Sequence, residues 1–305
     1  MTDDLDATRD SAERGGAAGR RDERRPLRPG LHLVATPIGH LGDLSARALD
    51  TLAGADLVLC EDSRVTGKLL KLNGVERSLL PYHEHNAARM RPKVLDNLAR
   101  GESVALASDA GTPLVSDPGY KLVRDVIEAG HEVLAVPGPS AVMAALVVSG
   151  LPTDRFLFAG FLPTKSVARR RAIDDVATVP ATLIWFESPK RLASTLTDLA
   201  AVLGPRPAAI ARELTKAFEE VRRGPLDELA STLAKESSPR GEIVILVGSP
   251  NVDANTLSDD DIDEALSEAL ETKSPSAAAA AVAAATGRPR RDLYRRALSI
   301  RGRGT

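Results

Sequence analysis

Residues 108–119 read Ser-Asp-Ala-Gly-Thr-Pro-Leu-Val-Ser-Asp-Pro-Gly, and the rest of the chain is organised around them. They follow the apolar run Ser103–Ala107, which predicts a strand, and precede a helical pattern that begins at Tyr120. A loop between a strand and a helix is where open α/β sheets hold ligands. Gly111 and Gly119 let the backbone take positive φ and approach a ligand closely. We interpret the run as a ligand-binding loop; the alternative is an ordinary turn-rich βα connection.

Two further loops follow predicted strands in the same way. The loop TPIGHL (36–41) comes after the apolar run Leu31–Ala35, and PGPSA (137–141) comes after Glu132–Val136. Because parallel strands end at one edge of a sheet, we expect the three loops to lie together there. The sequence contains neither the GxxxxGK[ST] loop of ATP-binding proteins nor the GxGxxG of dinucleotide-binding domains, so those two ligand classes are not expected.

Seven motifs occur in order between about residues 31 and 250. They are TPIGHLGDLS (36–45), LCEDSRVTGKLL (59–70), SDAGTPLVSDPG (108–119), PGPSAVMAALVVSGL (137–151), FESPKR (186–191), RELTKAFEEVRRG (212–224) and GEIVILV (241–247). With these motifs the chain resembles the tetrapyrrole methylase-fold methyltransferases, and most closely their bacterial branch that methylates a cytidine 2′-hydroxyl of 16S ribosomal RNA. The resemblance implies S-adenosylmethionine as cofactor, 16S rRNA in the small ribosomal subunit as substrate, and a homodimer.

The resemblance also implies which loop residues bind the cofactor, folded in a cleft between two domains. These residues are Pro37, Asp109, Gly111, Thr112, Val115, Ser140 and Ala141. The central loop departs from the GDPxxxGRG pattern of the superfamily, since Thr112 replaces an acidic residue and Ser116-Asp117-Pro118 replaces the usual ending. Because of these differences, the resemblance assigns the loop as a whole to the cofactor rather than each of its residues.

Composition restricts the class of protein. With 305 residues, 43% of them hydrophobic, the chain is long enough for two domains. Its formal net charge of −2 means that RNA affinity must come from local basic patches. The single cysteine, Cys60, excludes an internal disulfide and Cys-based zinc clusters, and we expect no metal. No apolar run approaches the roughly 18 residues that span a membrane, and no signal peptide begins the chain, so we expect a cytoplasmic protein without membrane contact.

The predicted fold class is α/β, with two α/β domains of the tetrapyrrole methylase type and a small C-terminal helical module. Residues 1–29 mix acids with arginines without any helical or strand period, which predicts a disordered tail. Residues 30–138 are the predicted N-terminal domain and residues 139–250 the C-terminal domain. Residues 256–303 are the predicted module, which we expect to be helix-turn-helix-like and to contact RNA.

The N-terminal domain alternates apolar runs with helical patterns, which predicts a mainly parallel sheet covered on both faces. Its expected strands are Leu31–Ala35, Leu57–Cys60, Ser78–Tyr82, Ser103–Ala107 and Glu132–Val136. The C-terminal domain is expected to contain antiparallel strands. Its expected strands are Arg155–Gly160, Thr182–Phe186, Ala208–Arg212, Glu219–Arg223 and Glu242–Val247.

The C-terminal segment changes composition twice. Ser258–Glu271 is acidic, Ser276–Ala285 is almost pure alanine and valine, and Arg288–Arg303 is rich in arginine. Thr286–Pro289 predicts a break between two helices, as in helix-turn-helix units. The basic last helix could lie on RNA phosphates. The alternative is a helical bundle whose arginines are solvated or pair with the acidic helix.

Methyl transfer to a ribose hydroxyl benefits from a general base, because a hydroxyl is a poor nucleophile. The candidates, all placed after predicted strands, are Glu61, Asp62, His83, His85 and Glu213. Glu61 could instead form an ion pair with Arg64 or Lys68. His83 and His85 could be read as a metal pair, but no third ligand is in view, which disfavours that reading.

Basic residues near these motifs are interpreted as RNA contacts, because RNA affinity depends largely on phosphate contacts. They are Arg64, Lys68, Lys165, Arg169, Arg170, Arg171, Lys190, Arg191, Arg212, Lys216, Arg290, Arg291 and Arg295. Two other functions fit the same motifs. One is a methylase of a corrin precursor or of a modified protein side chain, and the other is a non-catalytic ribosome-binding module.

Overall fold

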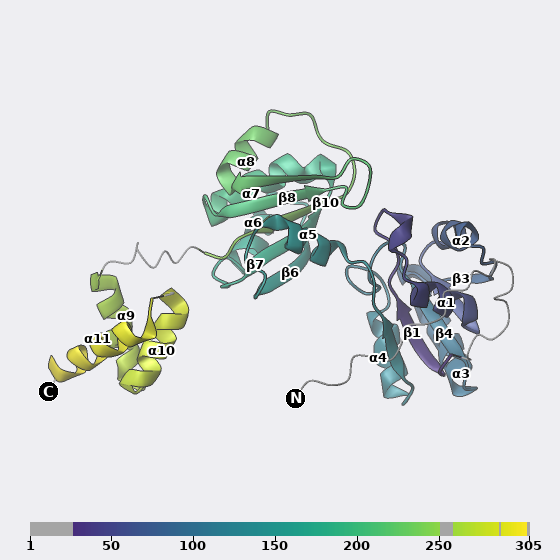
Figure 1. Cartoon of the computed structure of the whole chain (residues 1–305), viewed down its shortest axis with the longest axis horizontal. Helices are drawn as coiled ribbons and strands as arrows, with labels where there is room; N and C mark the ends of the chain where they lie inside the picture. Colours follow the sequence, from purple (N-terminus) through teal and green to yellow (C-terminus); the bar gives the residue numbers. More distant parts are fainter. Residues whose placement is uncertain (1–26, 251–258, 287, 304–305) are drawn as a thin grey trace, which may run out of the picture. The chain divides into compact units, whose positions relative to one another are not determined.

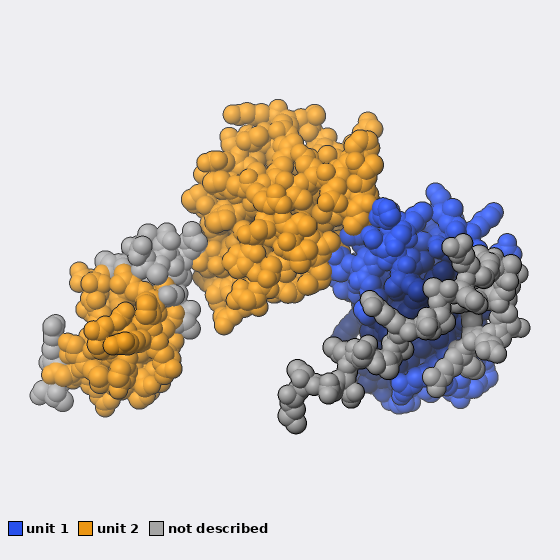
Figure 2. Space-filling view, viewed as in Figure 1, with its two compact units in different colours: residues 1–140 blue, residues 141–305 orange. Residues whose placement is uncertain are grey.

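The computed structural model describes residues 27–250, 259–286 and 288–303 (Figure 1). The predicted disordered tail therefore lies, apart from residues 27–29, outside the described residues. The chain divides into two compact units, residues 1–140 and 141–305 (Figure 2). None of the helices in the described ranges is long and apolar enough to cross a membrane.

The first unit contains a five-stranded sheet in the order β3-β2-β4-β1-β5. Its strands are β1 (Gly30–Val34), β2 (Leu57–Cys60), β3 (Leu79–Pro81), β4 (Ser103–Ala107) and β5 (Val133–Val136). Every neighbouring pair is parallel, which confirms the predicted parallel sheet. All residues of the central strand β4 are buried, because both faces of the sheet are covered.

Helices cover both faces of this sheet. Between the strands lie η1 (Leu41–Asp43), α1 (Ala46–Gly54), α2 (Ser63–Leu72), α3 (Glu84–Ala99) and α4 (Tyr120–Glu128). Val94 of α3 and Leu122 of α4 belong to the core on one face, and Leu52 of α1 and Leu70 of α2 belong to the core on the other. Burying each such side chain contributes about 1.5–3 kcal/mol.

Side-chain caps fix where these helices begin. The Ser45 Oγ accepts a hydrogen bond from the Ala48 amide at 3.0 Å at the start of α1. The sequence pattern predicts a helix over Ala87–Arg100, but α3 begins three residues earlier, at Glu84, because the His83 amide donates to Asn86 Oδ1 at 3.0 Å. His85 therefore lies in the first helical turn rather than in a loop, which corrects the sequence-based placement.

The second unit contains a five-stranded sheet in the order β6-β7-β10-β8-β9. Its strands are β6 (Phe156–Phe161), β7 (Thr182–Glu187), β8 (Pro207–Arg212), β9 (Glu220–Pro225) and β10 (Ile243–Val247). The pair β6–β7 is parallel, and β10 is antiparallel to both β7 and β8. The β8–β9 hairpin is antiparallel as well, so the predicted antiparallel strands are confirmed.

Helices of the second unit lie on opposite faces of its sheet. They are α5 (Ala141–Ser149), α6 (Ser166–Asp174), η2 (Pro189–Arg191), α7 (Leu192–Leu203) and α8 (Leu226–Leu233). The main core contains Ile173 of α6, Leu196 of α7 and Leu229 of α8. The helix α5 packs against β8, β9 and β10 on the other face (Figure 1). The helix α8 is not among the elements expected from the sequence.

A three-helix module follows at the C-terminal end. Its helices are α9 (Asp259–Thr272), α10 (Pro275–Thr286) and α11 (Arg290–Arg303). Ile262 and Leu266 of α9 pack with Val282 of α10 and with Leu293 and Ala297 of α11. The predicted break between the last two helices is confirmed, because α10 ends at Thr286 and α11 begins at Arg290.

Candidate functional site

Backbone and side-chain hydrogen bonds join the three predicted ligand loops at the carboxyl edge of the first sheet. The Thr36 amide donates to the Gly111 carbonyl at 2.9 Å, and the Gly111 amide donates back to the Thr36 carbonyl at 3.0 Å. The Thr112 hydroxyl donates to the Pro139 carbonyl at 3.1 Å. The loops that follow β1, β4 and β5 therefore form one surface, as the sequence predicted.

The central loop contains several residues with positive φ, two of which are not glycine. Gly111 has φ +83°, and a Cβ there would lie 3.3 Å from Ile38 Cγ2. Leu114 and Ser116 also have positive φ, 72° and 66°, although neither is glycine. Each such residue costs about 1–3 kcal/mol, and strain of this kind is retained mainly at ligand-binding and active sites. Backbone of alternating handedness turns successive amides into anion-binding concavities.

The predicted cofactor residues lie in or beside these loops. Pro37 is buried next to the Thr36–Gly111 hydrogen bonds, and Val115 lies between the two strained residues. Asp109 Oδ1 accepts a hydrogen bond from the Asp62 amide at 3.0 Å, which ties the central loop to the end of β2. Ser140 and Ala141 lie where the first unit ends and the second begins.

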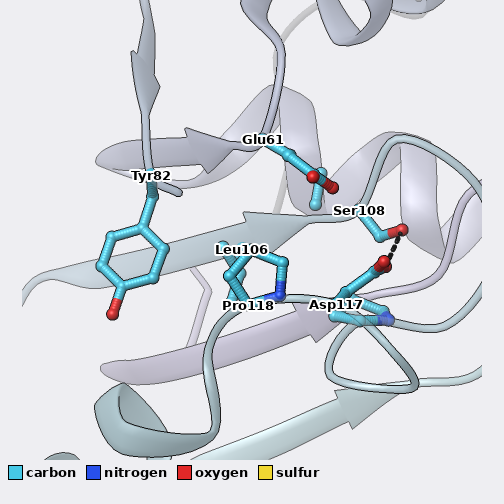
Figure 3. A pocket seen from close by; sticks show the side chains of 8 residues that line it. Glu61, Tyr82, Leu106, Ser108, Asp117 and Pro118 are labelled. Carbon is cyan, nitrogen blue, oxygen red and sulfur yellow. Dashed lines mark hydrogen bonds between the residues drawn. The ribbon is translucent and has the colours of Figure 1, made fainter. Parts of the chain in front are cut away.

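A pocket lies beside the central loop at the same edge of the sheet (Figure 3). Glu61 follows β2, Tyr82 follows β3 and Ser108 follows β4, so three neighbouring strands deliver side chains to it. The lining residues are Glu61, Tyr82, Leu106, Ala107, Ser108, Pro113, Asp117 and Pro118. Sequence reasoning did not single out Tyr82, Ser108 or Asp117 as site residues, although two of them stand inside the quoted central loop.

Three acidic side chains of this edge, Glu61, Asp109 and Asp117, have raised pKa values. Burial raises the pKa of Glu61, and the negative charges of Asp117, Asp109 and Asp62 raise it further. Burial also raises the pKa of Asp117 and of Asp109. A carboxylate whose pKa is raised holds a proton more strongly, so Glu61 has the character of a general base.

Asp62 is poorly suited to the same task. Its carboxylate accepts hydrogen bonds from the Arg64 side chain at 2.6 Å and from the Arg64 amide at 2.8 Å. The hydrogen bonds from Arg64 lower the pKa of Asp62 to about 2. Asp62 is thus a helix cap for α2 and the ion-pair partner of Arg64. The predicted ion pair between Glu61 and Arg64 is not formed, because Arg64 binds Asp62 instead.

The other base candidates do not line the pocket. His83 caps α3, and its ring contacts the His85 ring edge-on at a centroid distance of 5.9 Å. Glu213 belongs to the second unit, where its Oε1 accepts hydrogen bonds from the Glu242 amide and the Lys216 Nζ, both at 3.0 Å. The bond from Glu242 contributes most to lowering the pKa of Glu213. The described residues contain no cluster of His, Cys, Asp and Glu that is arranged to hold a metal ion.

One predicted RNA contact is wrong. Arg169 has a side chain only 5% exposed, and its guanidinium lies 2.6 Å from the Asp198 carboxylate. Buried charges need such partners, so Arg169 stabilises the packing of α6 on α7 and does not reach solvent. The sequence could not separate it from Arg170 and Arg171, because all three stand in one basic run.

Other predicted RNA contacts divide into paired and exposed groups. Arg191, Arg212 and Lys216 are half-buried and form ion pairs with Glu187, Glu220 and Glu213. Arg170 pairs with Asp198 and Arg64 with Asp62, but both keep exposed surface. The remaining basic candidates are exposed. They are Lys68, Lys165, Arg171, Lys190, Arg290, Arg291 and Arg295.

An arginine of α11 pairs with the acidic helix α9, and others are exposed. Arg296 pairs with Asp259 and Asp263 of α9, as the bundle alternative expects. Arg290 and Arg291 are exposed at the start of α11, which is where a recognition helix meets nucleic acid. The acidic helix therefore neutralises part of the basic helix and leaves its first turn accessible.

Comparison with protein families and curated proteins gives consistent matches. Residues 30–230 match the family model described as Tetrapyrrole (Corrin/Porphyrin) Methylases, and residues 256–301 match the RsmI C-terminal HTH domain. A protein named Ribosomal RNA small subunit methyltransferase I from Mesorhizobium japonicum is 52% identical over 278 residues, which cover 91% of this chain and 94% of that protein. The protein of the same name from Xylella fastidiosa is 49% identical over 267 residues, which cover 87% of this chain and 97% of that protein.

Solved structures match the fold at low sequence identity. Diphthine synthase has a TM-score of 0.56 at 15% identity, over 72% of this chain and 89% of that chain. The uroporphyrin-III-C-methyltransferase from Thermus thermophilus has a TM-score of 0.52 at 22% identity, over 72% of this chain and 94% of that chain. At these identities the similarity shows the architecture alone.

Proposed function

Because the chain belongs to the tetrapyrrole methylase family of S-adenosylmethionine-dependent methyltransferases, and its relatives are rRNA small subunit methyltransferases, we propose that it methylates the 2′-hydroxyl of a cytidine in 16S rRNA. One observation from the structure supports this proposal. The strained central loop and the pocket containing Glu61 lie at one edge of the same sheet, which places a ligand loop beside a candidate base.

The residues of the central loop suit the cofactor. Gly111 leaves space that a side chain would fill, and the positive φ of Leu114 and Ser116 turns the backbone into a concave surface that suits a carboxylate. We assign the binding of S-adenosylmethionine to Pro37, Asp109, Gly111, Thr112, Val115, Ser140 and Ala141. Bound there, the cofactor supplies an electrophilic methyl group on a sulfonium. The protein contributes fixed amides and a surface shaped for one orientation.

Glu61 is the proposed general base. Its carboxylate takes the proton of the ribose hydroxyl as the hydroxyl oxygen approaches the methyl carbon. The raised pKa makes this transfer more favourable than it is for an exposed carboxylate. Tyr82 and Leu106 form an apolar wall of the same pocket, which limits the access of water to the Glu61 carboxyl.

The proposed partner is the RNA of the small ribosomal subunit, in the cytoplasm. The support is the set of exposed basic side chains outside the pocket, including Lys165, Arg171, Arg290 and Arg291. A chain with a net charge of −2 holds RNA through such local groups rather than through its overall charge. A corrin or protein side-chain substrate would not need basic groups on two separate helices.

The enzyme is further proposed to act as a homodimer. The helix α5 is apolar along its whole length, and Met143 and Val147 are exposed one turn apart on it. Apolar side chains repeated on one helical face are typical of a contact with a second copy. Light scattering should give twice the chain mass of 32.3 kDa at micromolar concentration, and a monomer there would refute the dimer.

The decisive experiment compares substrates directly. Purified protein and labelled cofactor are incubated with small ribosomal subunits, with free 16S RNA and with a corrin precursor, followed by nucleoside mass spectrometry of the RNA. We expect 2′-O-methylcytidine from one of the RNA samples. Label in the macrocycle would instead assign the protein to the corrin methylases. Cofactor binding without any product would favour the non-catalytic module.

A further inference from the structure

Asp117 is an acidic side chain in the pocket with no assigned role. It lies on the central loop between the strained Ser116 and Pro118. Its Oδ2 accepts a hydrogen bond from the Ser108 hydroxyl at 2.7 Å, and the Ser108 oxygen accepts one from the Ala110 amide at 3.1 Å. Ser108 is itself buried at the end of β4, so the Asp117 carboxylate is fixed against the sheet edge (Figure 3).

A second Ser–Asp pair on β4 shows what such a pair does in a purely structural setting. At the other end of the strand, the Ser103 hydroxyl donates to Asp56 Oδ2 at 2.7 Å, and the Ser103 amide donates to the same oxygen at 2.8 Å. The side-chain hydrogen bond from Ser103 is the main cause that lowers the pKa of Asp56. This pair favours the charged carboxylate and so stabilises the fold.

The pKa of Asp117 is raised, whereas the pKa of Asp56 is lowered. Burial raises the pKa of Asp117 even though the Ser108 hydrogen bond opposes the change. The fold therefore holds this carboxyl group where its charge is disfavoured. An acidic group kept in such a place at the ligand edge is typical of a functional site rather than of a structural cap.

Glu61 lines the same pocket as Asp117 (Figure 3). Three charged groups act on Glu61 from the elements around it: Asp117 and Asp109 from the central loop and Asp62 from its own loop. Asp62 is ion-paired with Arg64, and Asp109 accepts a hydrogen bond from the Asp62 amide; neither of the two lines the pocket. Among these three charges, that of Asp117 raises the pKa of Glu61 most, and Asp117 is the one of the three that lines the pocket.

We propose that Asp117 is a positioning residue that acts through Glu61: held by Ser108, its carboxylate shares the pocket with the Glu61 carboxyl and keeps Glu61 ready to accept the proton of the substrate hydroxyl. A neighbouring negative charge makes it harder for Glu61 to remain ionised and so increases its affinity for a proton. The proton moves from the hydroxyl oxygen to a Glu61 oxygen and afterwards to water. This inference rests on the proposed role of Glu61 as the base.

The test is the pH dependence of methyl transfer under single-turnover conditions, with small subunits or 16S RNA as substrate. For Asp117→Asn we expect the acidic limb of the rate profile to move to lower pH, by about one unit or less, because Glu61 loses its negative neighbour. Affinity for S-adenosylhomocysteine, measured by calorimetry, should stay within about twofold, since a positioning role for Glu61 leaves the loop intact. Asp56→Asn removes the carboxylate of the matched pair and should leave the limb in place.

Each outcome decides one question. An unmoved limb in Asp117→Asn, or a loss of cofactor affinity that accounts for the lost activity, overturns the inference. If Asp117→Asn does not fold, Ser108→Ala serves as the second test, because it releases the Asp117 carboxylate without removing it. This variant should move the acidic limb of the rate profile in the same direction, by a smaller amount. Glu61→Gln separates the two proposals: a limb that survives in this variant refutes the base role itself. A limb that vanishes there but stays fixed in Asp117→Asn refutes only the role of Asp117.

Discussion

Thr36 and Gly111 exchange a pair of backbone hydrogen bonds, of 2.9 Å and 3.0 Å, although 75 positions of the chain separate them. The pair joins the loop after β1 to the loop after β4, two neighbouring strands of the sheet. It holds Gly111 at a φ that side chains rarely adopt, within reach of Ile38. The contact joins two of the three loops that we propose as the cofactor-binding surface.

Gly111→Ala should therefore weaken cofactor binding. The added Cβ would lie 3.3 Å from Ile38 Cγ2 at a φ of +83°, so the loop must shift or carry strain of about 1–2 kcal/mol. Gly101→Ala is the matched control, because Gly101 has φ +76° and open space around its Cβ position. Both variants should lose thermal stability, but only Gly111→Ala should lose affinity in calorimetry. Equal affinities in the two variants would remove the central loop from the cofactor site.

Glu61→Gln should lower the single-turnover rate of methyl transfer by roughly 10²–10⁴-fold while the cofactor still binds, because the amide cannot accept the proton. In the proposed mechanism the carboxylate form of Glu61 accepts the proton. Burial raises the pKa of Glu61, so with decreasing pH the rate should begin to fall at a higher pH than it would for an exposed glutamate. Single-turnover rates of methyl transfer, measured at a series of pH values, test this prediction. A Gln variant with wild-type rates would contradict the assignment of Glu61.

Arg169→Ala should destabilise the second unit. The change leaves the buried Asp198 carboxylate with fewer partners, at a cost of about 3–5 kcal/mol in the free energy of unfolding. Arg171→Ala removes an exposed charge two positions away on the same helix and should change stability by less than about 0.5 kcal/mol. Urea denaturation of both variants is the measurement. A stable Arg169→Ala protein would show that Arg170 and Ser166 together satisfy Asp198.

Changing Arg290 and Arg291 to alanine should weaken RNA binding without affecting cofactor affinity. Both side chains are exposed at the start of α11. Each lost phosphate contact should reduce the slope of log affinity against log salt by about 0.7–0.9. Lys273→Ala, which removes an exposed charge after α9, serves as the control. Filter binding at several salt concentrations measures the slope, and an unchanged slope in the double variant would exclude α11 from the RNA contact.

The sequence determined much of the fold by itself, because local patterns carry that information. Apolar runs such as Ser103–Ala107 predicted strands, and the βα alternation of the first unit predicted a parallel sheet, both of which the structure confirms. The loops after β1, β4 and β5 were also predicted to meet, since parallel strands end at a common edge. The start of α3 was misplaced by three residues, because a capping bond from a neighbouring side chain gives no periodic signal.

Only the tertiary structure decided which environment each charged side chain has. Glu61 and Asp62 are adjacent in sequence, yet burial beside Asp117 raises the pKa of one and Arg64 lowers the pKa of the other. Arg169 and Arg171 belong to one basic run, yet the first is buried against Asp198 and the second is exposed. The burial of Glu61 and the partner of Arg169 depend on groups brought from distant positions of the chain, which no local sequence pattern records. Arg64 is near both Glu61 and Asp62 in sequence, so only the folded chain decides which of the two it binds.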